Sequence, residues 1–118
     1  MNPREKFEQV TLTIPINTTT SDILFCASGT LVGIITPAAL TGTAFSFKVS
    51  PKVSSDGAVG DFYDFYNVAG SAVSVTVAAS RYIGIVPSDM SGVNCLKIVS
   101  NASEAAARTI ICVIRDVQ

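Results

Sequence analysis

The sequence predicts an all-β domain, built as a two-sheet antiparallel β-sandwich of roughly eight or nine strands. Its hydrophobic residues alternate with a period of two rather than 3.6. The alternating runs are short and rich in β-branched residues, and Gly, Pro, Asn, Asp and Ser interrupt them at regular intervals. A chain of 118 residues has the length of one domain. Strand number alone allows both jelly-roll and immunoglobulin-like topologies.

The first half of the chain contains four predicted strands. Residues 10–16 alternate apolar residues with threonine, and Pro15 indicates an edge position because proline donates no ladder hydrogen bond. Residues 23–27 and 30–36 form two short apolar runs around Ser28 and Gly29. In residues 44–50, Phe45, Phe47 and Val49 share one face.

The second half predicts four more strands and one helical turn. The strands cover residues 73–77, 81–86, 95–100 and 109–117, and the helical turn covers residues 88–91. The last strand is the longest apolar run, which is typical of a central strand covered on both faces. Residues 101–108 are alanine-rich and predict a loop or a helical turn.

Between the two halves lies the stretch SSDGAVGDFYDFYN, residues 54–67. The glycines predict a turn that leads into an aromatic strand, although Phe62, Phe65 and Tyr66 also fit helical spacing. On a strand, Phe62, Asp64 and Tyr66 face one side, and Tyr63, Phe65 and Asn67 face the other. Such a strand either presents one face to a protein partner or is half buried with its tyrosine hydroxyls in water.

For the partner interpretation, the expected contact residues in this stretch are Asp61, Tyr63 and Phe65. A calcium site is an alternative, because loops supply carboxylate and carbonyl oxygens together. The spacing does not match an EF-hand loop, and Asp56-Gly57 is typical of a turn. No metal site is therefore assigned.

The N-terminal residues Met1–Gln9 differ in composition from the rest of the chain. They carry charged residues around the single apolar residue Phe7. We expect a flexible arm over residues 1–9 and a single β-sandwich domain over residues 10–118. The arm is either a frayed terminus or a segment that docks on a neighbour through Arg4, Lys6 and Phe7.

The composition limits the kinds of partner. Only 14% of the residues are charged, compared with about a quarter in average chains, so part of the surface is expected to be covered by a protein partner. Eight basic and nine acidic residues are scattered along the chain. This pattern argues against nucleic-acid binding. No apolar run reaches the length of a signal peptide or a membrane span, so export and membrane insertion are not expected.

The reactive side chains limit the possible chemistry. The chain has no histidine, which removes the commonest general base and transition-metal ligand, so an enzyme is not expected and no catalytic residue is assigned. Asp61 with Asp64, or Asp56 with Asp89, remain as carboxylate pairs of the glycosidase kind. The three cysteines form no CxxC pair and lie in apolar runs, which predicts buried, reduced core thiols. No cofactor is expected.

The chain resembles the capsid decoration proteins of tailed bacteriophages, also called cement or staple proteins. The resemblance is carried by TLVGI at residues 30–34, FKVS at 47–50, SSDG at 54–57 and FYDFYN at 62–67, followed by the runs at 75–100 and 105–115. The charged arm and the stretch from Pro51 to Gly60 depart from the pattern.

The resemblance implies a jelly-roll-like β-sandwich on the outside of an icosahedral capsid, made in the host cytoplasm. It would be a dimer or trimer that bridges major capsid protein subunits. The runner-up is a carbohydrate-binding module of a phage tail or fibre, because aromatic platforms beside carboxylates bind sugars. The absence of tryptophan weakens that alternative.

Overall fold

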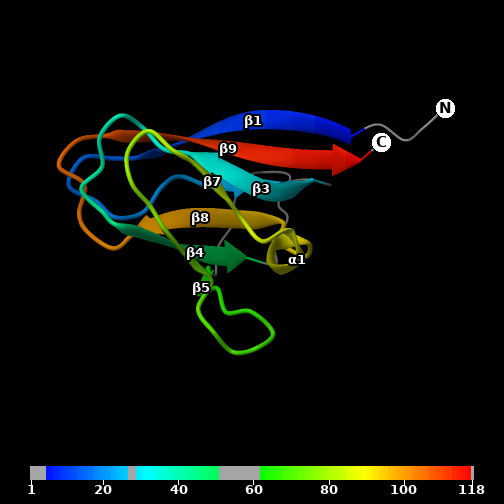
Figure 1. Ribbon diagram of the computed structural model, residues 1–118. Coiled ribbons are helices and arrows are strands. Elements are labelled where there is room, and N and C mark those ends of the chain that lie inside the picture. The colour runs from blue at the N-terminus through cyan, green and yellow to red at the C-terminus, as the bar shows by residue number, and fades with distance from the viewer. Residues whose placement is uncertain (1–4, 27–28, 51–61, 118) are drawn as a thin grey trace.

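The protein is a β-sandwich, as the sequence predicts. The computed structural model describes residues 5–26, 29–50 and 62–117. Within these residues, nine strands form a four-stranded and a five-stranded sheet that face each other (Figure 1). The elements are β1 (Glu5–Ile14), β2 (Leu24–Phe25), β3 (Thr30–Ile35), β4 (Ala44–Ser50), β5 (Tyr63–Asp64), β6 (Ser74–Thr76), β7 (Tyr82–Gly84), α1 (Pro87–Met90), β8 (Cys95–Ser100) and β9 (Arg108–Val117).

The strand order identifies a jelly roll. β1 pairs with β9, β2 with β8, β3 with β7 and β4 with β6, all antiparallel, so the chain forms one nested hairpin. This hairpin is rolled up because β9 also pairs with β3, and β8 with β4. The sheets are therefore ordered β1-β9-β3-β7 and β2-β8-β4, with β5 and β6 both beside β4. This order decides between the two topologies that the strand number allowed.

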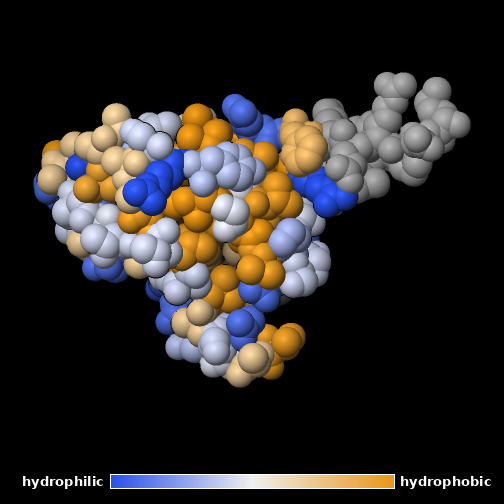
Figure 2. Space-filling model, viewed as in Figure 1, coloured by the Kyte–Doolittle hydropathy of each residue, from blue (hydrophilic) through white to orange (hydrophobic). Residues whose placement is uncertain are grey.

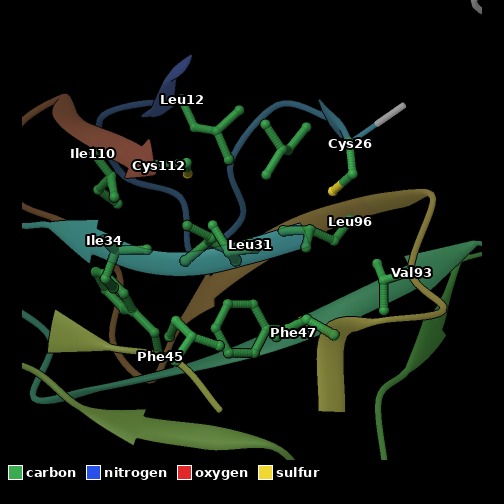
Figure 3. Packing of buried hydrophobic residues seen from close by; sticks show 14 of the residues in the cluster. Leu12, Cys26, Leu31, Ile34, Phe45, Phe47, Val93, Leu96, Ile110 and Cys112 are labelled. Atoms are coloured by element: carbon green, nitrogen blue, oxygen red, sulfur yellow. The ribbon is translucent and has the colours of Figure 1, made fainter. Parts of the chain in front are cut away.

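The core lies between the sheets and follows the alternation read from the sequence. Figure 3 shows Leu12, Leu31, Ile34, Ile110 and Cys112 of the β1-β9-β3-β7 sheet pointing toward Phe45, Phe47 and Leu96 of the other. Phe45 and Phe47 are at most 1% exposed, and they are the largest fully buried side chains among the described residues. Each such side chain stabilises the fold by about 2 to 3 kcal/mol through removal of apolar area from water.

The last strand is central, as predicted. β9 lies between β1 and β3, and its inward residues Ile110, Cys112 and Ile114 are buried. Val113 points to the other face and is also buried, which explains why the strand reads as a continuous apolar run. The three cysteines are buried and reduced, which confirms the prediction made for them.

The N-terminal boundary differs from the prediction. Residues Glu5–Gln9, expected in a flexible arm, form the first half of β1 and pair with β9 from Val117 to Val113. The physical reason is the length of β9, which continues past Cys112 and offers a backbone partner at each of these positions. Residues 1–4 lie outside the described part of the chain. β1 is the edge strand that Pro15 indicated, and it ends just before that proline.

A buried carboxylate joins the loops at one end of the sandwich. Glu104 is 0% exposed, and its two oxygens accept four hydrogen bonds. The donors are Thr41 N–H at 2.9 Å, Gly42 N–H at 2.9 Å, Ser100 Oγ at 2.8 Å and Arg108 Nε at 2.9 Å. Its backbone N–H donates to Thr18 O, and its backbone O accepts from Asn17 N–H. Glu104 therefore ties three connections together, in a segment where the sequence predicts only a loop or helical turn.

Candidate protein-binding surface

The aromatic stretch forms a projecting hairpin at the edge of the five-stranded sheet. We call residues 62–72 the aromatic hairpin. Its first arm contains β5, which pairs with β4 so that Tyr63 lies opposite Val49 and Asp64 opposite Lys48. An isolated bridge between Tyr66 and Ala72 closes the hairpin. Figure 1 shows the segment after β5 extending away from both sheets. The predicted strand is thus present but shorter than residues 62–67.

Hydrogen bonds hold the tip of the aromatic hairpin in one conformation. The side-chain oxygen of Asn67 accepts from Ala69 N–H at 3.0 Å and Ser71 N–H at 3.1 Å. The Asn67 N–H donates to Ser71 O, and Gly70 turns the chain at a φ of 81°, which glycine adopts without strain. A tip fixed in this way presents its side chains at a low entropic cost of binding.

The outer face of the hairpin contacts two lysines of the sheet. Lys48 and Lys97 lie directly opposite each other on β4 and β8, a like-charge pair that destabilises a sheet. The Asp64 carboxylate lies 3.9 Å from Lys48 Nζ, and the ring of Phe62 lies 4.5 Å from Lys97 Nζ. These exposed contacts contribute less than about 1 kcal/mol each. They orient the hairpin on the sheet, which is a structural role for Phe62 and Asp64.

The inner face carries Tyr63 and Phe65, as the predicted alternation requires. Phe65 is half buried and packs against the core, whereas Tyr63 is 60% exposed. Both line a cleft of about 260 Å³, together with Val49, Ser50, Asp89, Gly92 and Val93. Another hollow, of about 210 Å³, is lined in part by Phe65, Tyr66 and Ala72. Of Tyr63 and Phe65, Tyr63 is therefore the more accessible to a partner.

Sequence reasoning missed other exposed apolar residues. Tyr66 is 58% and Val68 108% exposed on the aromatic hairpin, and Tyr82 and Val86 are exposed near β7. Figure 2 shows hydrophobic residues gathered across the middle of the viewed face. The sequence signal for Tyr66 was present, since it belongs to the same aromatic run. Tyr82 and Val86 lie in the apolar run of residues 81–86. Only the pairing of β7 with β3 shows that their side chains are at the surface.

The remaining predicted contact residues do not join the aromatic hairpin. Phe7 lies in β1 of the other sheet and is 59% exposed. Lys6 also lies in β1, but its side chain is outside what the structure describes. Arg4 and Asp61 lie outside the described residues. Phe7 and Tyr63 therefore belong to two separate surfaces rather than one.

The described residues offer little reactive chemistry. Burial raises the pKa of the Cys26 thiol to about 11 and that of Cys112 to about 12, and it also raises the pKa of Cys95. These thiols are therefore poor nucleophiles and poor metal ligands. Within residues 5–26, 29–50 and 62–117, no three His, Cys, Asp or Glu side chains gather as a metal site. The expected loop carboxylates Asp56 and Asp61 are outside these ranges.

No helix among the described residues has the length and hydropathy needed to cross a membrane. The helix that the structure does contain, α1, spans four residues and begins at Pro87, which is favourable at the first position of a helix. It lies beside β3 and contributes the buried side chain Met90 to the core.

Fold and surface together define a jelly-roll β-sandwich protein with a rigid, aromatic projecting hairpin. No protein-family model and no curated protein match the chain. Among solved structures, it is similar to the SPBc2 prophage-derived protein YomS, with a TM-score of 0.63 and 9% sequence identity. The match covers 98% of each chain. At this identity the likeness describes the fold, from one end of the sandwich to the other.

Proposed function

We propose that the chain is a non-enzymatic structural protein of a tailed-bacteriophage virion. It binds the outside of the icosahedral capsid and stabilises the lattice by bridging neighbouring major capsid protein subunits. It is made in the host cytoplasm and acts on the capsid surface as a small homo-oligomer. Neither nucleic acid nor a membrane is its partner.

The aromatic hairpin is the observation that carries this proposal. It presents Tyr63, Tyr66 and Val68 to solvent on a segment fixed by backbone and Asn67 hydrogen bonds. Exposed aromatic side chains on a rigid support are typical of protein interfaces, because they bury a large area and lose little conformational freedom. A turn that only connected β5 to β6 would not need three exposed apolar side chains.

Two further observations support the proposal. The likeness to a prophage-derived protein extends over nearly the whole of both chains, so the same fold occurs in a protein of phage origin. The resemblance to capsid decoration proteins rests on the runs at residues 30–34, 47–50 and 62–67. These runs correspond in the structure to β3, the end of β4 and the first arm of the aromatic hairpin.

The proposed mechanism is a linked equilibrium. A protein that binds the assembled, expanded shell but not its dissociated subunits stabilises the shell by RT ln(1 + [L]/Kd), which is about 2.7 kcal/mol per site at 100 times Kd. Many copies add these contributions over the lattice. A small oligomer that contacts two subunits also gains from effective concentration, so individually weak contacts suffice.

Binding to purified empty shells tests the proposal. The protein is mixed with expanded shells of the phage that encodes it, and the bound copies are measured by co-sedimentation. We expect saturable binding, and we expect Tyr63→Ala to reduce occupancy at least tenfold at limiting concentration. Tyr82→Ala is the matched control, because Tyr82 is 59% exposed and lies in the other sheet. Absence of binding by the unchanged chain would refute the function, and equal loss from both variants would refute the role of the aromatic hairpin.

Deletion of residues 1–9 is not a suitable test of shell binding, because part of this segment belongs to the sheet. Deleting Met1–Gln9 would remove the first half of β1 and leave residues 113–117 of β9 without their β1 partners. A loss of shell binding after that deletion would therefore report damage to the sheet. Phe7→Ala changes one exposed side chain in β1 and leaves its backbone pairing intact.

The cleft beside Tyr63 favours a second function, carbohydrate binding in a phage tail or fibre. Its lining combines the aromatic residues Tyr63 and Phe65 with Asp89, around a volume of about 260 Å³. Titration with host surface polysaccharide by calorimetry distinguishes the two functions. Heat of binding that is lost in both Tyr63→Ala and Asp89→Asn would favour this alternative, and no heat would exclude it.

A further inference from the structure

The free edge of β1 is the longest open sheet edge among the described strands. β1 ends its sheet and spans ten residues, whereas the other outer strands β2, β5, β6 and β7 span two or three. Figure 1 shows β1 along the upper rim of the sandwich. Short outer strands are a common protection against pairing with other chains, and β1 lacks it. The edge of β1 is therefore open to pairing with a strand of another chain.

The hydrogen bonds of Thr13 show which backbone groups face away from β9. Thr13 N–H donates to Asp22 Oδ1 at 2.8 Å, and Asp22 N–H donates to Thr13 O at 3.2 Å. Because peptide groups alternate along a strand, Phe7, Gln9 and Thr11 direct their N–H and C=O the same way. All three residues are exposed, and no other described strand pairs with them on this side. Asp22 closes the edge only at its C-terminal end.

We infer that the free edge of β1 pairs antiparallel with β1 of a second copy of this chain, with the two-fold axis at Phe7. This pairing joins two four-stranded sheets into one continuous sheet across the dimer. It forms three hydrogen-bonded residue pairs: Phe7 with Phe7 of the partner subunit, and Gln9 with Glu5 of the partner subunit on each side of the axis. These pairs amount to about six backbone hydrogen bonds. It also places the two exposed Phe7 residues directly opposite each other.

The charges of the strand favour this register over its neighbours. Centred on Phe7, the pairing keeps Glu8 from facing Glu8 of the partner subunit, and it leaves Thr13 clear of the partner strand. Centred on Glu8, it would put two glutamates opposite each other. Centred on Gln9, it would require Thr13 to pair with Glu5 of the partner subunit, although the Thr13 N–H already donates a hydrogen bond to Asp22. Charged residues on an edge strand commonly prevent pairing. Here Glu8 disfavours the register centred on itself and leaves the register centred on Phe7 open.

An isologous contact of this kind produces a closed dimer rather than a filament, because both copies use the same edge. It gives the homo-oligomer of the proposed function a specific interface on the sheet opposite the aromatic hairpin. The pairing concerns the purified chain alone and does not rest on shell binding. Failure of either proposal can therefore be observed without the other.

Disulfide cross-linking of variants that each introduce one cysteine into β1 tests the register in the full chain. Oxidation of Phe7→Cys should give a covalent dimer, because hydrogen-bonded antiparallel partners lie about 5.5 Å apart between Cα atoms, within disulfide range. Gln9→Cys and Thr11→Cys are the matched controls, whose symmetry mates would be roughly 13 Å and 27 Å apart along the strand. The native cysteines are buried and do not interfere. Cross-linking of Gln9→Cys instead of Phe7→Cys would overturn the register.

Light scattering over a range of concentrations tests the edge itself. Gln9→Pro removes an N–H that faces away from β9, so the fold keeps its ladder, while the dimer loses two hydrogen bonds and the close approach of the strands. We expect its dimer dissociation constant to rise at least tenfold. Gly84→Pro is the control on the short edge strand β7, where an added Cβ meets no neighbour within 4 Å, and it should leave the constant unchanged. A chain that stays monomeric at millimolar concentration, or a dimer unaffected by Gln9→Pro, would overturn the inference.

Discussion

Replacement of Glu104 by glutamine should lower the stability of the protein markedly. Each oxygen of the carboxylate accepts two hydrogen bonds, one set from Thr41 and Arg108 and the other from Gly42 and Ser100. Glutamine has the same size but offers only one acceptor oxygen, and its amide N–H₂ would face two donors. The Ser100 hydroxyl can rotate and accept, whereas the Gly42 N–H has no such freedom. The substitution therefore leaves one buried N–H without an acceptor and an uncompensated charge near Arg108.

The pKa of Glu104 indicates the size of the effect. Burial by itself raises this pKa, but the four donated hydrogen bonds outweigh burial and lower it from 4.5 to about 2. This difference corresponds to on the order of 3 kcal/mol of stability. Because the pKa of the folded state is the lower one, the contribution is complete above pH 4.5 and is lost as the pH falls toward 2. For a domain whose total stability is about 5 to 15 kcal/mol, the loss is large.

Urea unfolding at several pH values measures this effect. We expect Glu104→Gln to unfold with a free energy about 3 kcal/mol below that of the unchanged chain at pH 7. The gap should narrow between pH 4.5 and 2, where the carboxylate of the unchanged chain becomes protonated. Asp89→Asn, a change at a partly exposed carboxylate outside the Glu104 cluster, should alter stability by less than about 1 kcal/mol. A Glu104→Gln gap that is absent at pH 7, or constant down to pH 2, would refute this account of Glu104.

Three further predictions concern the core and its ends. The thiols of Cys26, Cys95 and Cys112 should not react with a thiol reagent at pH 8 in the native protein, and all three should react in denaturant; rapid native labelling would contradict their burial. Gly42→Ala should lower the unfolding free energy by about 2 kcal/mol, because its Cβ would collide with Ser100 Oγ and crowd the neighbouring carboxylate; an unchanged melting temperature would argue against that contact. Phe45→Ala should cost about 3 to 5 kcal/mol in denaturant unfolding through the cavity it leaves, and a loss below 1 kcal/mol would contradict full burial.

The sequence predicted most of the fold because alternation is a local property. Residues 95–100 form β8 as expected, and β9 begins one residue earlier than predicted, since both are short apolar-rich runs between loop residues. The jelly-roll order could not be read in this way. It depends on pairings such as that of β1 with β9, which join the two ends of the chain and leave no local signal.

The candidate site was predictable in part for the same reason. Alternation placed Phe62 and Tyr63 on opposite faces correctly, but only the register with β4 shows that Phe62 covers Lys97 while Tyr63 stays exposed. The role of Glu104 was not predictable, because a glutamate in an alanine-rich loop is ordinarily solvated. Its burial follows from donors that lie more than sixty residues earlier in the chain, at Thr41 and Gly42.

Quantitative mass spectrometry of purified virions tests the proposed function most directly. The quantity to measure is the number of copies of this chain for each copy of the major capsid protein. Shell decoration predicts one copy per capsid subunit, or a simple fraction of it, and the ratio should fall when particles are prepared with the Tyr63→Ala chain. Absence of the chain from the particles, or a copy number that follows the tail proteins instead of the shell, would contradict the account.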